Sequence, residues 1–136
     1  MTRLARLMRV YGHSMAPTLK PGELVVVSPA AYRRRAPQRG EIVAVRPASL
    51  GGRVFVKRIV GLPHERVKVG EQEWQLADDQ FFLLGDQTEH SADSRIFGPV
   101  SSEELVGPIR KLGTFLFFRR FRSRKNRSVP DFSSVG

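Results

Sequence analysis

The sequence of 136 residues contains no cysteine, and this absence removes several kinds of chemistry at once. A chain without thiols has no disulfide scaffold, no thiolate nucleophile and no cysteine-ligated zinc or iron–sulfur site. The sequence also lacks a run of about 18 consecutive apolar residues, which a membrane-spanning helix requires. Because Arg3, Arg6 and Arg9 interrupt its first ten residues, we expect neither a membrane anchor nor a cleavable signal peptide. The expected location is cytoplasmic or peripheral to a membrane, and no cofactor is expected.

Acidic residues are scarce, at 13 against 23 lysines and arginines, which gives a formal net charge of +10. Ten of the 13 acids lie between positions 64 and 104, so the basic surface is concentrated elsewhere. The apolar share of 40% suffices for one packed core. We therefore expect one domain over residues 10–114, a basic lead-in over 1–9, and an aromatic and basic, partly disordered C-terminal segment over 115–136.

Short runs rich in valine, separated by proline and glycine, predict β-strands. The runs are Glu23–Ser28, Glu41–Arg46, Val54–Val60, Glu65–Val69, Phe81–Leu84 and Leu105–Arg110. Apolar stripes with a period of 3.6 are absent from the middle of the chain, which favours a small, mostly-β barrel or sandwich of antiparallel strands. At the N-terminus, Thr2–Val10 is expected to form a basic helical turn that leads into a strand at Val10 and Tyr11.

The segment Gly12–Leu19 places a serine, Ser14, after an expected strand and ahead of Pro17. Gly12 lets the backbone approach a ligand and the proline bends the chain away, so the serine can stand exposed beside backbone N–H groups. Such a serine could act as a nucleophile. Taken alone, however, a serine beside a proline more often serves turn geometry.

A lysine stands in the middle of the strand-like run Val54–Val60. Because side chains alternate along a strand, Lys57 shares a face with Phe55 and Ile59, while Arg58 lies on the opposite face. If that face is buried, the loss of hydration lowers the pKa of the lysine and makes its amine available as a general base. The alternative is an edge strand whose cations both reach water.

A polar segment, Gly85–Arg95, separates two apolar stretches. Its short hydrogen-bonding side chains can fix the loop from within, and Asp93 and Arg95 are placed to pair with each other. An ordinary solvated loop is the alternative interpretation.

Together these segments resemble the consecutive conserved boxes of bacterial type I signal peptidases. The matching boxes are, in chain order, Ser14–Leu19, Gly40–Val43, Val56–Pro63, and Gly85–Asp86 continued by Ser91–Arg95. They cover roughly residues 10–110, and four boxes in this order and spacing identify the chain as a member of the family. The resemblance implies a Ser–Lys serine endopeptidase on the mostly-β fold shared with LexA-type self-cleaving repressors.

The resemblance also implies a role for each matching residue. Ser14 would be the nucleophile that forms the acyl-enzyme, and Lys57 would be its general base and later the acid for the leaving amine. Ser91 would orient the amine of Lys57. Asp93 and Arg95 would form a structural ion pair that holds the loop.

The substrate implied by the resemblance is a precursor polypeptide with small residues, typically alanine, at the first and third positions before the cut. The residues implied for its shallow apolar pocket are Met15, Leu19 and Val56, and those implied for the oxyanion site are the backbones of Gly12 and Ser14. Two processes fit this substrate. One is the removal of a signal peptide. The other is the maturation of nickel-type superoxide dismutase, in which proteases that resemble soluble, anchorless relatives of this kind remove the N-terminal pro-segment.

Three features depart from the family pattern. Gly12 stands where many members have a hydroxyl residue that assists the oxyanion, so backbone N–H groups must supply this stabilisation. Gln87 replaces a common asparagine, and His64 replaces a common glycine. Because only 27 residues separate Lys57 from Gly85, we expect no inserted cap domain.

Two other kinds of site remain open. A Ser-His-Asp triad would use His13, His64 or His90, although on a strand His13 would point away from the adjacent serine. A metal site would combine His90 with Asp86 and Asp93, whose spacing follows no recognised ligand rule. The Ser–Lys interpretation explains more residues with fewer assumptions, and no metal is expected.

The excess of positive charge also permits binding functions. No helix-turn-helix precedes the domain, so specific nucleic-acid binding is not expected. The aromatic run Phe115–Phe118 and the arginines after it fit a peripheral contact of residues 115–127 with an anionic membrane, or the run completes the core. The alternative functions are therefore a non-catalytic or self-cleaving LexA-like module and a basic protein that binds membrane surfaces.

Overall fold

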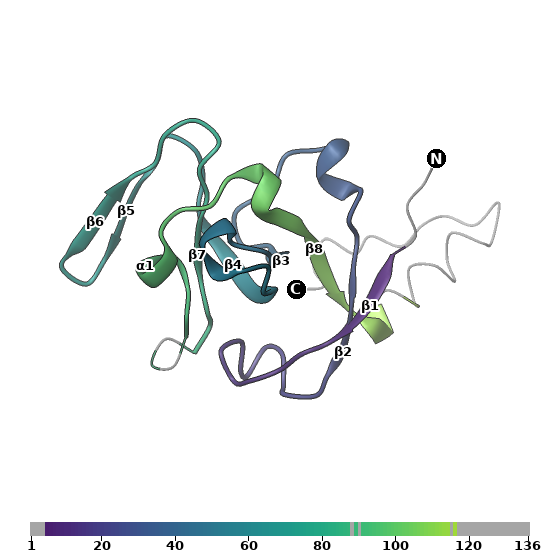
Figure 1. The fold of residues 1–136 in the computed structure, drawn as a ribbon. Helices are drawn as coiled ribbons and strands as arrows, with labels where there is room; N and C mark the ends of the chain where they lie inside the picture. Colours follow the sequence, from purple (N-terminus) through teal and green to yellow (C-terminus); the bar gives the residue numbers. More distant parts are fainter. Residues whose placement is uncertain (1–4, 88, 90, 115, 117–136) are drawn as a thin grey trace, which may run out of the picture.

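The computed structural model describes residues 5–87, 89, 91–114 and 116, which form a mostly-β structure (Figure 1). Its strands are β1 (Arg6–Arg9), β2 (Leu24–Val27), β3 (Ile42–Val45), β4 (Phe55–Gly61), β5 (Arg66–Val69), β6 (Gln72–Gln75), β7 (Phe82–Leu84) and β8 (Leu105–Lys111). The connections include the short helical turns η1 (Ala31–Arg33), η2 (Ala48–Leu50), α1 (Ser94–Phe97) and η4 (Ser102–Glu104). The predicted mostly-β fold class is confirmed.

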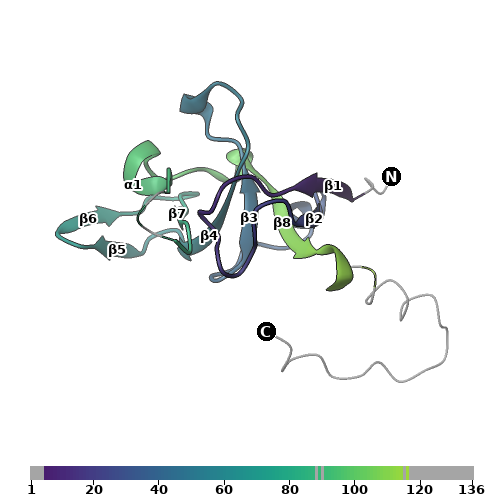
Figure 2. The ribbon, with the colours of Figure 1, turned by 90° about the horizontal axis from the view of Figure 1, so that it is seen from below.

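Six of the strands form one sheet in the order β1-β2-β8-β3-β4-β7, and each neighbouring pair is antiparallel. In the described part of the chain β1 and β7 stand at opposite ends of this order, so the sheet does not close into a barrel. β5 and β6 form a separate hairpin, which projects from the end of the molecule opposite β1 (Figure 1 and Figure 2). Open antiparallel sheets agree with the sandwich alternative.

The valine-rich runs predicted as strands overlap β2, β3, β4, β5, β7 and β8. The helical turn expected over Thr2–Val10 is wrong in its described part, because Arg6–Arg9 pair with Leu24–Val27 as strand β1. The predictions also omit β6. Gln72–Gln75 contains a single apolar residue, Trp74, so the run carries no hydrophobic signal of a strand.

The core is built on both faces of β3, which lies in the middle of the sheet. Val43 and Val45 belong to one apolar cluster, and Ala44 between them belongs to a second. The second cluster also contains Met15 and Leu19 from the loop between β1 and β2. Burial of a large apolar side chain contributes about 1.5–3 kcal/mol, so the core itself fixes this loop.

The segment between β4 and β7 contains only the β5–β6 hairpin, in line with the expected absence of a cap domain. The Trp74 ring packs on Phe82 with the ring centroids 4.5 Å apart. Gly61, at the end of β4, allows a close approach, because a Cβ atom there would lie 2.5 Å from Val67 Cγ2. The hairpin is therefore packed against the β4–β7 end of the sheet.

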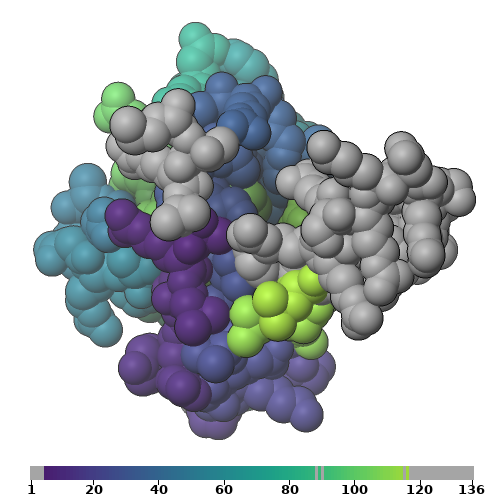
Figure 3. Space-filling view, turned by 90° about the vertical axis from the view of Figure 1, so that its right-hand side faces the viewer, coloured from purple at the N-terminus to yellow at the C-terminus, as the bar shows by residue number. Residues whose placement is uncertain are grey.

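β1 is an edge strand, and Figure 3 shows it in purple at the surface of the molecule. Within the described residues, no helix combines the length and the apolar character needed to cross a bilayer. From the sequence we expect a membrane contact or a disordered tail in the C-terminal segment. Its residues 115 and 117–136 lie outside the described residues.

Candidate active site

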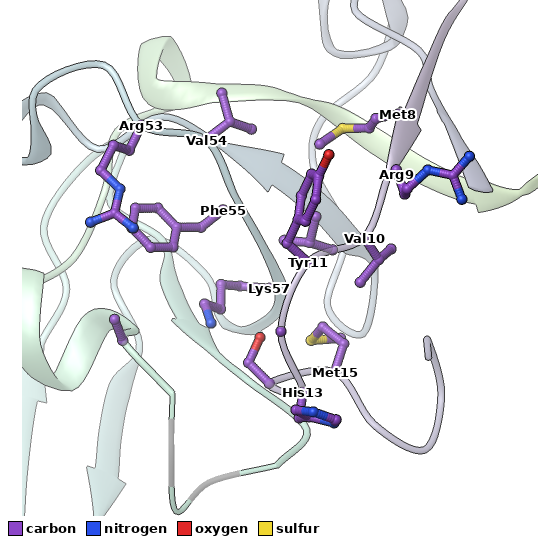
Figure 4. A pocket seen from close by; sticks show the side chains of 14 residues that line it. Met8, Arg9, Val10, Tyr11, His13, Met15, Arg53, Val54, Phe55 and Lys57 are labelled. Atoms are coloured by element: carbon purple, nitrogen blue, oxygen red, sulfur yellow. The ribbon is translucent and has the colours of Figure 1, made fainter. Parts of the chain in front are cut away.

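A groove of about 390 Å³ lies between two segments of the chain (Figure 4). One wall is formed by Met8–Met15, at the end of β1 and in the following loop, and the other by Arg53–Lys57, which leads into β4. Ala92, from the polar loop, also borders the groove. Ser14 and Lys57 both line it, although they come from different parts of the sequence.

Ser14 stands in a tight turn whose neighbouring residues are anchored. The Ala16 N–H donates to the His13 carbonyl at 3.0 Å, and the Leu19 N–H donates to the Met15 carbonyl at 2.8 Å. Met15 and Leu19 are each only 1% exposed. Met15 and Leu19 are therefore fixed in the core, while Ser14 itself borders the groove.

The backbone at Gly12 and Ser14 is open to a ligand. Gly12 has a φ of 75°, in the left-handed region that favours glycine, and a Cβ atom there would meet nothing within 4 Å. The Ser14 N–H donates to no acceptor among the described residues. This N–H is therefore available to a substrate oxygen, which is the kind of donor that stabilises an oxyanion.

Lys57 is 2% exposed and lies on the face of β4 that also buries Ile59. Its Nζ donates to Ser91 Oγ at 3.0 Å and lies 5.9 Å from the centroid of the Phe55 ring. Burial lowers the pKa of Lys57 below that of a free lysine, and the nearby negative charge of Asp93 offsets only part of this effect. The buried amine is shifted toward its neutral form.

Asp93 is fully buried and organises the polar loop. Its carboxylate accepts hydrogen bonds from the Arg95 backbone N–H at 3.1 Å, from Arg95 Nε at 2.9 Å and from Arg95 Nη2 at 2.8 Å, and also from the Gly85 N–H at 3.3 Å. Burial alone would raise the pKa of Asp93, but the bonds from Arg95 and Gly85 outweigh it and lower this pKa. The positive charge of Arg95 also contributes to the lowered pKa of Lys57.

The loop that carries Ser91 also contacts the turn of Ser14. The Gln87 N–H donates to the Ser14 carbonyl at 2.7 Å. Gly85 fills the narrow space between the two serines, because a Cβ atom there would lie 2.8 Å from the Ser14 carbonyl oxygen and would collide with Ser91 Oγ. The position of Ser14 relative to Ser91 thus depends on a glycine at position 85.

Asp86 connects the same segments through charged hydrogen bonds. Its carboxylate accepts from Arg58 Nε at 2.9 Å and Nη2 at 2.8 Å, and from Thr18 Oγ1 at 2.7 Å. Arg58 follows Lys57 on β4, and Thr18 belongs to the turn after Ser14. The bond from Arg58 lowers the pKa of Asp86, so this carboxylate stays ionised and holds the turn to β4.

Ser14 and Lys57 do not hydrogen-bond to each other in the described part of the chain, since the lysine amine bonds Ser91 Oγ instead. Catalytic hydrogen bonds are often long before a substrate binds. The structure shows that Ser14 and Lys57 border one groove and that the lysine amine is hydrogen-bonded to Ser91 Oγ.

Residues 1–74 and 69–112 match the family model described as signal peptidase, peptidase S26. The chain belongs to this family. It is 31% identical over 134 residues to a probable signal peptidase I-2 of Synechocystis, covering 78% of this chain and 62% of that relative. It is 35% identical over 108 residues to the mitochondrial ATP-independent inner membrane protease subunit 1b of Arabidopsis thaliana, covering 73% of this chain and 64% of that relative. A solved signal peptidase I from Enterococcus faecalis matches with a TM-score of 0.46 and 24% identity, over 54% of this chain and 97% of that chain. The chain spans less than two thirds of the length of these two curated relatives.

The pocket residues expected from the signal peptidase family do not all reach the groove. Met15 and Val56 line it, whereas Leu19 does not and is instead buried in the core cluster beside Met15. Ser91, Asp93 and Arg95 are also not among the lining residues.

The two histidines that the structure describes in this signal peptidase family member have different surroundings. His13 lines the groove next to the serine, His64 pairs with a surface aspartate at 2.7 Å, and His90 lies outside the described residues. His64 has a φ of 70°, which explains why a glycine suits this position in the family. No group of three or more His, Asp or Glu residues within the described ranges could hold a metal, and Asp86 and Asp93 are both engaged by arginines.

The sequence does not reveal the contacts by which Gly85, Asp86 and Thr18 position the turn of Ser14. From the sequence, Asp86 is a member of a matching box and a possible metal ligand, and Thr18 is a member of a matching box. The only sign of their importance in the sequence is that they belong to the matching segments. Such a match does not show which residues of one segment contact another segment. That information comes from the hydrogen bonds and close contacts of the folded chain.

Gly85→Ala is expected to fold but to lose about 10²-fold in peptide turnover. The added methyl group must displace either Ser91 or the Ser14 carbonyl, and a misplacement of about 1 Å at a reacting centre costs on the order of 10²-fold. The measurement is kcat/KM on a peptide substrate, with thermal melting as a test of folding. Gly113→Ala is the matched control, since its methyl group would meet nothing within 4 Å. Turnover at the wild-type rate in Gly85→Ala would contradict this account of the loop.

Proposed function

We propose that this member of the signal peptidase family is a serine endopeptidase that acts through a dyad of Ser14 and Lys57. The observation that carries the proposal is a lysine that is 2% exposed, has a lowered pKa and lines the same groove as the serine. An ordinary lysine has a pKa of about 10.4 and would be almost fully protonated at neutral pH. A buried lysine in its neutral form can accept the proton of a serine hydroxyl.

In the first half of the proposed reaction, Ser14 Oγ attacks the carbonyl carbon of the scissile peptide bond and its proton passes to Lys57 Nζ. The Ser14 N–H, which has no acceptor in the described residues, donates to the oxyanion that forms. When the carbon–nitrogen bond breaks, Lys57 gives its proton to the leaving amine. The N-terminal part of the substrate is then held as an ester on Ser14.

In the second half, a water molecule attacks the ester carbonyl and transfers a proton to Lys57. The ester bond breaks, Lys57 returns the proton to Ser14 Oγ, and the N-terminal fragment leaves as a carboxylic acid. Ser91 is a positioning residue in this scheme, because its hydroxyl bonds the lysine amine at 3.0 Å. A hydroxyl adds no negative charge that would stabilise the ammonium, so it orients Lys57 while leaving its pKa low.

The proposed substrate is a precursor polypeptide with small residues at the first and third positions before the cut. Support comes from the apolar residues Met15 and Val56, which line the same groove as Ser14. Two precursors fit this description: an exported protein with a signal peptide, and a nickel-type superoxide dismutase with an N-terminal pro-segment.

The test uses the purified chain and quenched peptides with Ala, Leu or Lys at the first position before the cut, with products mapped by mass spectrometry. We expect cleavage after Ala to be at least about 10-fold faster than after Leu or Lys, a discrimination within reach of a small apolar pocket. Peptides spanning a signal-peptide junction and a superoxide dismutase pro-segment junction then compare the two precursor classes. Absence of any cleavage, or self-cleavage alone, would reject the proposal in favour of a LexA-like module.

A further inference from the structure

The groove carries positive charge with no acidic counterpart. Its lining residues include Arg9, Arg53 and Lys57, and none of the described residues that line it is Asp or Glu. Most of the acidic residues lie between positions 64 and 104, and Ala92 is the only described residue of that range that borders the groove. A carboxylate that enters the groove therefore meets the guanidinium groups of Arg9 and Arg53 and, among the described lining residues, no competing anion.

Two of these three basic side chains are already engaged. Arg9 Nη1 donates to the Gly22 carbonyl at 2.7 Å, and Lys57 Nζ donates to Ser91 Oγ at 3.0 Å. Arg53 differs, because it has no ion pair with any residue that the structure describes. Its guanidinium carbon lies 5.3 Å from the centroid of the Phe55 ring (Figure 4). Stacking on an aromatic face orients a guanidinium and leaves its N–H edges free to bind a carboxylate.

The position of Arg53 is fixed by the chain on both sides. Gly51 and Gly52 have φ values of 61° and 83° and turn the backbone immediately before it. After Arg53 the chain runs into β4 and reaches Lys57 four residues later. The Arg53 guanidinium carbon and Lys57 Nζ lie 5.3 Å and 5.9 Å from the centroid of the same Phe55 ring, so the two groups are at most about 11 Å apart. An extended substrate rises about 3.3 Å per residue and spans this distance with about three to four residues.

We propose that Arg53 is a specificity-determining residue that selects precursors with an Asp or Glu side chain about four residues from the scissile bond. The inference rests on the proposed peptidase function and adds a substrate class to it. A planar guanidinium binds a carboxylate through two parallel hydrogen bonds, which a substrate amide cannot reproduce with the same charge. A lysine at the same substrate position meets repulsion from Arg53 and from the basic groove.

The experiment compares peptides that carry one Glu or one Gln at each position from the sixth before to the sixth after the cut, with Ala at the first and third positions before it wherever those positions are not being scanned. We expect wild-type kcat/KM to favour Glu over Gln about 5–10-fold at a position near the fourth, and this preference to fall as NaCl rises from 50 to 500 mM.

Arg53→Gln should remove the preference but still cleave the Gln peptides at close to the wild-type rate. Arg53→Glu should favour a Lys peptide instead. Arg34→Gln, which removes an exposed arginine that does not line the groove, is the matched control and should keep the preference.

Binding separates this inference from the proposed chemistry. In a Ser14→Ala background, the Glu peptide should bind about 5–10-fold more tightly than the Gln peptide, and Arg53→Gln should abolish the difference. Equal binding and equal cleavage of all Glu and Gln peptides by a chain that cleaves them would overturn the role of Arg53 and leave the peptidase function intact. Failure of the wild-type chain to bind or cleave any peptide would overturn both.

Discussion

Ser14→Ala is expected to fold like the wild-type chain and to lose peptide cleavage by at least about 10⁴-fold. Removing the nucleophile of a serine peptidase costs losses of this order or larger, because the remaining groups cannot form the acyl-enzyme. Folding is preserved because Ser14 Oγ has no hydrogen-bond partner among the described residues, and because Met15 and Leu19 anchor the turn. The measurement is kcat/KM on the Ala peptide, with a thermal melt of the same sample.

Ser49→Ala provides the matched control for this prediction. Ser49 lies on the exposed turn η2, and it does not line the groove. Its loss should leave both activity and melting temperature unchanged. A folded Ser14→Ala protein that retains a tenth or more of wild-type activity would show that another residue attacks the substrate.

Lys57→Met is expected to lose turnover to the same extent, while being at least as stable as the wild-type chain at neutral pH. Burial of Lys57 without a carboxylate at hydrogen-bond distance is costly, as the lowered pKa of its amine shows. Methionine has a similar length and fills the space without a charge. Loss of activity together with a gain in stability distinguishes a catalytic lysine from a structural one.

The stability difference between the wild-type chain and Lys57→Met should change with pH in a definite direction. Because the pKa of Lys57 is lower in the folded chain than in the unfolded one, the unfolded chain binds more protons between these two values. The free energy of unfolding of the wild-type chain should therefore rise as pH increases from the pKa of Lys57 in the folded chain toward about 10.4, its pKa in the unfolded chain. The excess stability of Lys57→Met over the wild-type chain should shrink over the same pH range. Activity should rise through an apparent pKa well below that of free lysine. Urea unfolding at pH 7 and pH 10 and a pH–rate profile measure both effects.

Three substitutions separate the lysine from a histidine base. Lys57→Arg keeps the positive charge but cannot be deprotonated, so it should be inactive. His13→Ala and His64→Ala should keep substantial activity, because neither histidine is needed to activate Ser14 in this scheme. An active Lys57→Arg protein, or a folded histidine variant without activity, would contradict the dyad.

The strands could be predicted from valine-rich runs between turn residues, and alternation along β4 put Lys57 on the face that it shares with Phe55 and Ile59. Both inferences work because they depend on neighbours in the sequence. The edge strand β1 was missed since Arg6–Arg9 alternate no apolar and polar residues in a regular way, and their strand conformation comes from pairing with β2. Strand pairing between distant segments cannot be inferred from one segment alone.

The same limit applies to the site. Family boxes identified Ser14, Lys57 and Ser91 as a set, but they gave no sign that Gly85 separates the two serines or that Asp86 joins Thr18 to Arg58. Leu19, which the resemblance assigns to the pocket, is not among the lining residues, because its side chain packs in the core cluster beside Met15. Side-chain direction in a loop depends on where the core lies, which the local sequence does not state.

The most direct test of the Ser14–Lys57 mechanism is the intact mass of the wild-type chain during turnover of an activated ester with Ala at its first and third positions. An ester acylates a serine nucleophile readily, so an acid-quenched sample should contain protein heavier by the acyl group of the substrate. We predict that the adduct lies on Ser14 and is absent from Ser14→Ala and Lys57→Met. Turnover without an adduct on Ser14, or with the acyl group on another residue, would contradict the mechanism.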